Sequence, residues 1–314
     1  MTEQNIQNIN ENIIVTKGMS KRFGKKLALD NCEITISQGG IHALIGANGA
    51  GKSTLFRILL GFDSPTTGSS TVLGMDSQAL TPQMRGRIGY VNEEHTLPTW
   101  MTAGEVTQMQ KALYPQWQQA IYDSVIGNFD VEPDQKISGL SRGERAGLNL
   151  SMALAQSPEL LILDEPTLGL DVVAKQAFLE ALMHTETDSS NNTTTIVYCS
   201  HQMEEIERVA DNLIIIEKGQ VKYTASPDEL CERISYWICN FESAGPVDQE
   251  IPGLLSMKVI EGQHHIMVID QPIDTVKSTL LQLGADEPVQ APVNLDKAVN
   301  SLLAKNHKSA KKAK

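Results

Sequence analysis

Short apolar runs recur through the first 225 residues and are separated by segments with helical periodicity. Residues 41–45 form one such run and lead into a glycine-rich stretch, and residues 160–163 form another that ends at two acidic residues. Runs of this length and composition are typical of buried strands. The predicted strands cover residues 13–15, 32–36, 41–45, 160–163, 196–200 and 213–216.

Helical segments alternate with these runs. Residues 54–60 are predicted to form a helix that ends at Gly61, and the apolar positions between 174 and 182 follow the spacing of an amphipathic helix. The stretch from about residue 93 to residue 157 is rich in Gln and other helix formers, so we expect a helical insert there. The Ser-, Asn- and Thr-rich residues 189–195 predict a surface loop. Strands that alternate with helices predict an α/β core.

A second, smaller domain is expected after Ser226-Pro227. Residues 254–260 and 265–269 flank a Glu-Gly-Gln turn and predict a hairpin, and residues 273–283 predict a helix that stops at Gly284. The chain is therefore divided into a first domain over residues 1–225, an accessory α+β domain over 226–304 and a basic, disordered tail over 305–314.

Composition narrows the classes of function. The formal net charge is -12, and broad nucleic-acid binding is disfavoured because phosphate contacts need clustered Lys and Arg. Residues 1–12 are polar, and no stretch approaches the roughly 18 apolar residues that span a bilayer. Four cysteines without a CxxC pair suit a reducing compartment. We expect a cytoplasmic protein whose membrane association, if any, comes through a partner.

One glycine-rich stretch carries a specific chemical signal. Between a predicted strand and a predicted helix, the sequence fits the pattern GxxxxGK[ST], whose backbone N–H groups cradle phosphates. Lys52 is expected to contact the β- and γ-phosphates, and the Ser53 hydroxyl to hold Mg²⁺. The candidate nucleotide-binding residues here are Gly46, Asn48, Gly49, Ala50, Gly51, Lys52, Ser53 and Thr54. This pattern alone leaves kinases, GTPases and ATPases open.

Two carboxylates follow the strand over residues 160–163. A carboxylate at the end of a buried strand is costly unless a cation or hydrogen bonds meet it. We therefore expect Asp164 to hold Mg²⁺ and Glu165 to polarise the attacking water, with Lys52 and Glu165 in the catalytic set.

The sequence Leu-Ser-Arg-Gly-Glu over residues 140–144 is similar to the signature motif of a known family. It resembles the LSGGQ signature of the ABC (ATP-binding cassette) ATPases, with Arg142 and Glu144 in place of the usual Gly and Gln. Ser141 and Glu144 also match a capping box, which marks the start of a helix, and the two interpretations are compatible. With the phosphate loop and the Leu-Asp-Glu-Pro-Thr stretch over 163–167, the resemblance covers residues of about 13–225.

The resemblance implies roles for further residues. Phe23 would stack on adenine, although a plain core residue is the alternative. Ser141 and Gly143 would contact the ATP held by an opposite subunit. Asp171 would face that subunit, and His201 would contact the γ-phosphate as a catalytic residue. At Glu93 the family usually has Gln, and Glu93 could still meet the metal or the water.

The resemblance also implies a fold and a function. The first domain resembles a P-loop NTPase nucleotide-binding domain with a helical insert. The chain as a whole most resembles the single-cassette subunits of ABC-2-type exporters. Such a chain would bind ATP and Mg²⁺, pair with a second ATPase subunit, and drive a transmembrane permease subunit at the cytoplasmic face of the membrane. Residues 97–101 would dock a short permease helix, unless Trp100 and Met101 pack internally. The alternatives are a soluble ABC-class ATPase acting on a non-membrane partner and a regulatory module.

Overall fold

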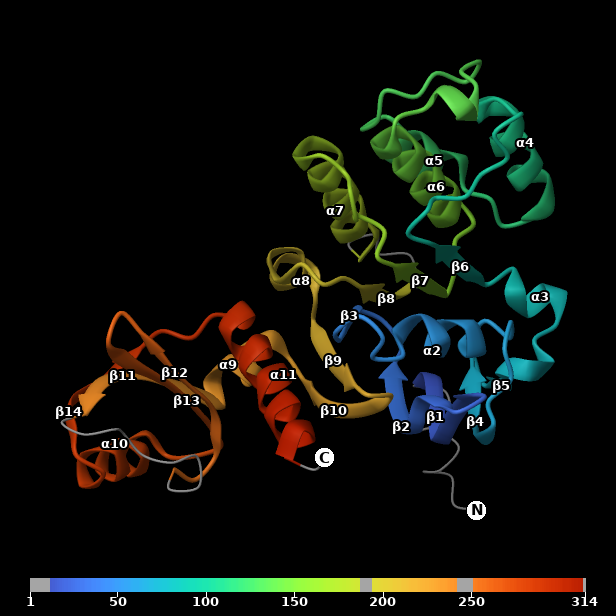
Figure 1. The fold of residues 1–314 in the computed structure, drawn as a ribbon. Coiled ribbons are helices and arrows are strands. Elements are labelled where there is room, and N and C mark those ends of the chain that lie inside the picture. Colours follow the sequence, from blue (N-terminus) through green and yellow to red (C-terminus); the bar gives the residue numbers. More distant parts are fainter. Residues whose placement is uncertain (1–11, 187–193, 242–250, 313–314) are drawn as a thin grey trace. The chain divides into compact units, whose positions relative to one another are not determined.

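The chain consists of two compact units, Met1–Thr224 and Ala225–Lys314, in a computed structural model (Figure 1). The backbone is described for residues 12–186, 194–241 and 251–312, and side chains are described up to residue 183 in the first range and residue 303 in the last. The polar N-terminus over 1–11 and most of the surface loop predicted over 189–195 lie outside the described residues.

A six-stranded sheet forms the centre of the first unit, in the order β10-β9-β3-β8-β7-β6. Its strands are β3 (Ile41–Ile45), β6 (Ile88–Val91), β7 (Leu160–Asp164), β8 (Thr195–Cys199), β9 (Asn212–Glu217) and β10 (Gln220–Ala225). The strands from β9 to β6 run parallel. The predicted α/β fold is confirmed, and the carboxyl ends of these parallel strands therefore lie along one edge of the sheet.

A four-stranded antiparallel sheet lies beside it, in the order β2-β1-β4-β5 (Figure 1). Its strands are β1 (Asn12–Phe23), β2 (Lys26–Ser37), β4 (Thr67–Val72) and β5 (Met75–Asp76). β1 and β2 extend well beyond the short strands expected at 13–15 and 32–36, because pairing of the two strands orders polar residues that carry little hydrophobic pattern. Leu55, Phe56 and Leu59 of α2 (Lys52–Leu59) are buried in the core with residues of both sheets.

Within the predicted insert lie α4 (Ala103–Leu113), α5 (Gln119–Ile126), the 3₁₀ turn η2 (Ile137–Gly139) and α6 (Arg142–Ala155). The 3₁₀ turn η1 (Ser77–Ala79) and α3 (Pro82–Arg85) precede it in the chain, and α7 (Val172–Glu186) and α8 (Met203–Val209) follow it. The insert has its own small core, which includes Val106, Ile137, Leu148 and Met152.

The second unit is a four-stranded sheet with three helices. It comprises α9 (Pro227–Glu232), β11 (Ile234–Phe241), β12 (Leu254–Ile260), β13 (Gln263–Ile269), α10 (Ile273–Gln282), β14 (Ala285–Ala291) and α11 (Leu295–Lys312), with the strands in the order β12-β13-β11-β14. β12 and β13 form the expected hairpin, whereas β11 and β14 were not predicted. α11 extends to Lys312, into the tail of 305–314 for which the sequence predicts disorder, and Leu295 and Leu302 anchor its first turns in the core.

Candidate functional site

The loop between β3 and α2 is shaped by glycines that no other residue could replace. A Cβ atom at Gly46 would lie 2.4 Å from the Ile216 carbonyl oxygen, and one at Gly51 would lie 2.6 Å from the carbonyl oxygen of Ala28. Gly51 also has a φ of +112°, which favours glycine. Glycine at these two positions therefore lets the loop pack closely against the backbone of β9 and β2.

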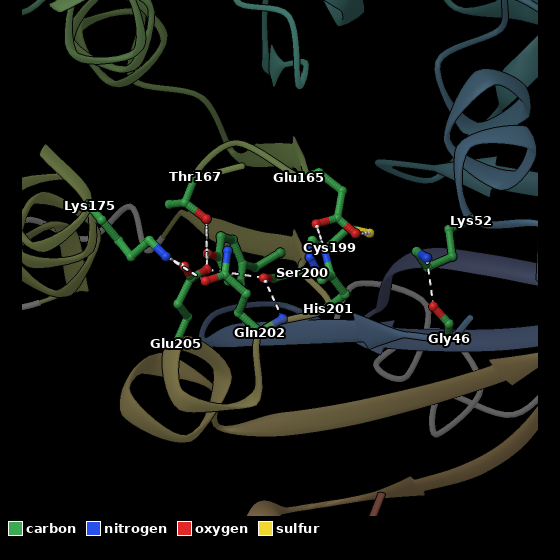
Figure 2. A network of polar contacts seen from close by, with 11 residues as sticks. Gly46, Lys52, Glu165, Thr167, Lys175, Cys199, Ser200, His201, Gln202 and Glu205 are labelled. Carbon is green, nitrogen blue, oxygen red and sulfur yellow. Dashed lines mark hydrogen bonds and ion pairs between the residues drawn. The ribbon is translucent and has the colours of Figure 1, made fainter. Parts of the chain in front are cut away.

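Lys52 begins α2 and is only 7% exposed. Its Nζ donates a hydrogen bond of 2.7 Å to the Gly46 carbonyl oxygen, across the loop (Figure 2). A buried ammonium group at a helix N-terminus forms a site for an anion such as a phosphate.

The two acidic residues lie at the same edge of the sheet, at the end of β7. Burial raises the pKa of the Asp164 carboxyl, although a hydrogen bond with the Ser53 hydroxyl acts in the opposite direction. Glu165 has a φ of +51°, a conformation that costs energy for a residue with a side chain. Its backbone N–H donates to the carbonyl oxygen of Cys199 at the end of β8, and this bond holds the strained residue in place.

Glu165 and His201 form a close polar pair. Nδ1 of His201 lies 2.7 Å from Oε2 of Glu165 (Figure 2). The His201 side chain is 49% exposed, whereas that of Glu165 is 13% exposed. His201 follows β8 and Glu165 follows β7, so the pairing results from the adjacency of these two parallel strands.

These groups open into one cavity of about 550 Å³. Among the candidate residues, its lining includes Asn48, Gly49, Gly51, Lys52, Ser53, Thr54, Glu93, Asp164, Glu165 and His201. Lys26, Ala28 and Leu168 also line it and were not predicted. A buried cation together with carboxylate and hydroxyl oxygens is the donor set expected for a phosphate chain with Mg²⁺, so the residues present fit that metal.

Other candidate residues do not line this cavity. They are Phe23, Gly46, Ala50, Ser141, Gly143 and Asp171, of which Gly46 and Ala50 belong to the loop itself. Phe23 ends β1 and is 47% exposed, with Nζ of Lys21 4.9 Å from its ring centre. Its exposure excludes the alternative of a plain core residue.

Ser141 and Asp171 each cap a helix. The Ser141 hydroxyl accepts from the backbone N–H of Glu144, and the Glu144 carboxylate accepts from the backbone N–H of Ser141, as the capping box predicts. The Asp171 carboxylate accepts from the backbone N–H of Ala174 at the start of α7. A Cβ at Gly143 would lie 2.7 Å from the Cβ of Ala174, so the starts of α6 and α7 pack closely.

Comparison with known proteins decides the family. A family model described as ABC transporter matches residues 29–168. The chain is 34% identical over 221 residues to Nod factor export ATP-binding protein I of Rhizobium johnstonii, covering 68% of this chain and 70% of that protein. The Rhizobium etli protein of the same name is 30% identical over 286 residues, covering 88% and 89%. The chain belongs to the ABC transporter family of ATP-binding subunits.

Solved ABC cassettes share this fold. An ATP-binding subunit of an ABC transporter has a TM-score of 0.62 at 24% identity and covers 70% of this chain and 92% of its own. The cassette MJ0796, in a dimeric post-hydrolysis state bound to ADP and Pi, has a TM-score of 0.59 at 22% identity and covers 68% and 98%. At this level of identity the likeness concerns the fold alone.

Membership settles the general activity of this ABC subunit: it binds and hydrolyses ATP, as its family does. ABC cassettes work as dimers with membrane subunits. In this subunit, no helix among the described residues is long and apolar enough to cross a bilayer.

Proposed function

We propose that this ABC subunit powers an exporter by a cycle in which two copies close on ATP and reopen after hydrolysis. The observation that carries this proposal is the convergence of Lys52, Asp164, Glu165 and His201 on one cavity of about 550 Å³. A cation, a metal-binding carboxylate and a second carboxylate paired with an imidazole are the groups that ATP hydrolysis requires.

Each side chain in the cavity has a proposed task. Lys52 binds the β- and γ-phosphates, and Ser53, Asp164 and Glu93 are the oxygen donors that hold Mg²⁺. The metal supplies charge neutralisation on the phosphate chain. Glu165 accepts a hydrogen bond from the attacking water, and His201 orients the Glu165 carboxylate through their 2.7 Å contact while its exposed side faces the γ-phosphate.

The site is proposed to be completed by a second copy of the chain. Ser141 and Gly143 stand at the N-terminus of α6 and outside the cavity, where they are available to a nucleotide held by another subunit. Next to Asp171, Val172 and Val173 are 79% and 78% exposed. Two such apolar side chains at the start of α7 are suited to burial when two copies meet head to tail.

A membrane protein is the proposed partner of the helical insert. Trp100 is 76% exposed, although the neighbouring Met101 packs against the core of the insert, so only the tryptophan is available to a partner. An exposed tryptophan seven residues after Glu93 in the sequence suits a helix-in-groove contact. Relatives named for the export of Nod factor support export as the direction, and docking there would hold this subunit at the cytoplasmic face of the membrane.

Affinity isolation of a tagged Glu165→Gln variant tests the proposal. The variant is captured with ATP from mildly solubilised membranes of cells that produce the protein. A polytopic membrane protein recovered in stoichiometric amount is the expected result, with ATP-free capture as the control. Recovery of a soluble dimer with no membrane partner would contradict the proposal and favour the alternative, an ABC-class ATPase that acts on a non-membrane partner.

A further inference from the structure

Four residues after His201 is a buried carboxylate that belongs to none of the recognised motifs. Glu205, in the first turn of α8, is only 3% exposed. Its Oε2 accepts hydrogen bonds from three hydroxyl groups: Thr167 at 2.7 Å, Tyr198 at 2.5 Å and Ser200 at 3.0 Å. Its Oε1 lies 2.9 Å from the ammonium group of Lys175 (Figure 2). A buried carboxylate is costly, and four donors that converge on it offset that cost.

The contacts keep Glu205 ionised. Burial by itself would raise the pKa of Glu205, but the hydrogen bonds from Tyr198, Thr167 and Lys175 outweigh it and leave the pKa below its ordinary value. The negative charge is therefore a permanent part of the folded site near neutral pH.

The donors come from separate segments that each carry a residue of the proposed site. Thr167 stands two residues after Glu165, and Ser200 directly precedes His201. Lys175 is in the first turns of α7, four residues after Asp171. Glu205 is therefore an acceptor at which the segments carrying Glu165, His201 and Asp171 meet.

Two further hydrogen bonds, both to Gln202, hold the His201 segment to the same cluster. The Ser200 hydroxyl, which donates to Glu205, also accepts from the backbone N–H of Gln202 at 3.1 Å. The ammonium group of Lys175 also donates to the side-chain oxygen of Gln202. Both neighbours of His201 are thus bonded to the Glu205 cluster, whereas the His201 ring itself contacts only Glu165 among the polar groups described.

We infer that Glu205 is a positioning residue for ATP hydrolysis, acting through His201. Its carboxylate accepts from the Ser200 hydroxyl, which also holds the Gln202 N–H, and from Thr167, and so ties the His201 segment to the segment after Glu165 and keeps the imidazole at the catalytic carboxylate. Glu205 does not line the cavity, so it is not proposed to contact the nucleotide. The inference rests on the proposed roles of Glu165 and His201 in hydrolysis.

The first test compares Glu205→Gln with the wild type. Gln has nearly the same shape but lacks the charge, and its amide presents an N–H₂ group to three hydroxyl donors that need an acceptor. We expect kcat for ATP to fall about 10- to 100-fold, as for a small misplacement of a catalytic group, while KM changes by less than about threefold. An unchanged kcat, or a loss confined to KM, would overturn the inference.

A matched control removes a different partly buried ion pair. Glu159 pairs with Arg87 near the opposite end of β7 from Asp164. Glu159→Gln should lower the thermal midpoint of unfolding and leave kcat unchanged. If Glu205→Gln does not fold, Ser200→Ala removes one donor and keeps the carboxylate, and its kcat should fall in the same direction by a smaller factor.

A double-mutant cycle separates positioning from general stability. In a His201→Ala background, Glu205→Gln should change kcat by less than about twofold, because the residue through which it acts is gone. The thermal midpoint should fall equally in both backgrounds. If the two effects on kcat multiply instead, Glu205 does not act through His201. Absence of ATP hydrolysis by the wild type would be a failure of the proposed function, whereas an active wild type with an equally active Glu205→Gln contradicts only this inference.

Discussion

The guanidinium group of Arg142 donates a hydrogen bond of 3.1 Å to the backbone carbonyl oxygen of Glu93. A Cβ atom at Gly169 would lie 3.2 Å from the Cζ of Arg142, so the same guanidinium also covers the loop that leads to Asp171. Arg142 stands where the related signature usually has glycine, and glycine has no side chain with which to make either contact. In this chain the signature is therefore joined to the Glu93 loop and the Gly169 loop within one subunit.

Arg142→Ala should weaken ATP-driven dimerisation and leave ATP binding by the single subunit unchanged. Arg142 is outside the cavity but lies between Ser141 and Gly143, and its loss frees two loops next to the proposed dimer interface. One hydrogen bond from a charged donor on the surface contributes about 1 kcal/mol, which corresponds to roughly a fivefold change in the dimer dissociation constant. Sedimentation velocity of the Glu165→Gln protein with ATP, with and without Arg142→Ala, measures this.

Lys136→Ala is the control for that experiment. Lys136 also donates to a backbone carbonyl in the helical insert, that of Trp100, and is exposed. Its ammonium group also lies 3.9 Å from the Glu105 carboxylate. In the described residues its side chain makes no hydrogen bond or ion pair with the signature or with Glu93, so its removal should not change dimerisation. Equal effects of the two substitutions would mean that a general loss of positive charge, and not the Arg142 contacts, weakens the dimer.

Glu165→Gln should bind ATP, turn it over at a small fraction of the wild-type rate and accumulate as a dimer. The amide keeps the size of the side chain and can still bond to His201, but it cannot act as a base toward water. Removal of a general base costs about 100- to 10,000-fold in rate. Phosphate release and size-exclusion chromatography with ATP measure both properties, and hydrolysis at the wild-type rate would remove Glu165 from the catalytic role.

Lys52→Ala should lose most of the affinity for ATP. The Lys52 ammonium is buried and directed across the phosphate loop, so its charged hydrogen bonds contribute about 1.5–3 kcal/mol, or roughly 10- to 100-fold in affinity. Lys26 lines the same cavity from β2 but is exposed. Lys26→Ala should therefore weaken binding by less than about fivefold. Titration calorimetry with the two variants distinguishes a buried phosphate ligand from a surface charge.

Much of the site was predictable because its chemistry is local in the sequence. The residues from Gly46 to Thr54 and the pair Asp164 and Glu165 follow strands that their apolar runs already indicate, and parallel pairing brings those strand ends together. β4, with the sequence Thr-Gly-Ser-Ser-Thr-Val, was missed because its strand conformation comes from pairing with β1 and not from a hydrophobic pattern.

Glu205 was missed for a different reason. It belongs to no motif, and its partners lie 5 to 38 positions away in the sequence, so only the fold brings them together. One signal was available: Glu205 precedes Ile206 and shares the buried face of α8 with it and with Val209. A carboxylate on an apolar helix face predicts a buried partner, although not its identity.

Acid should remove the stabilisation that Glu205 provides. Its folded-state pKa is below the ordinary value of 4.5, so the unfolded chain binds the proton more readily. The stabilisation of the folded state by ionised Glu205 is therefore fully present above about pH 4.5 and is lost as pH falls through the folded-state pKa. The difference in free energy of unfolding between wild type and Glu205→Gln, from urea titrations, should be constant between pH 6 and 7 and should shrink below about pH 4.5. A difference independent of pH would mean that the ionised carboxylate is not the stabilising form.

Trp100→Ala should separate ATP hydrolysis from engagement of the membrane partner. The side chain is 76% exposed, and in the described part of the chain it has no role in a core, so the isolated subunit should keep its kcat and its thermal midpoint. Loss of a buried interface tryptophan costs about 2 kcal/mol or more, so recovery of the membrane protein with the Glu165→Gln bait should fall sharply. Leu113, 65% exposed at the end of α4 in the same insert, provides the matched control. Since Leu113→Ala also removes an exposed apolar side chain, equal losses with both variants would indicate non-specific adhesion, whereas a loss confined to Trp100→Ala would place the docking surface at Trp100.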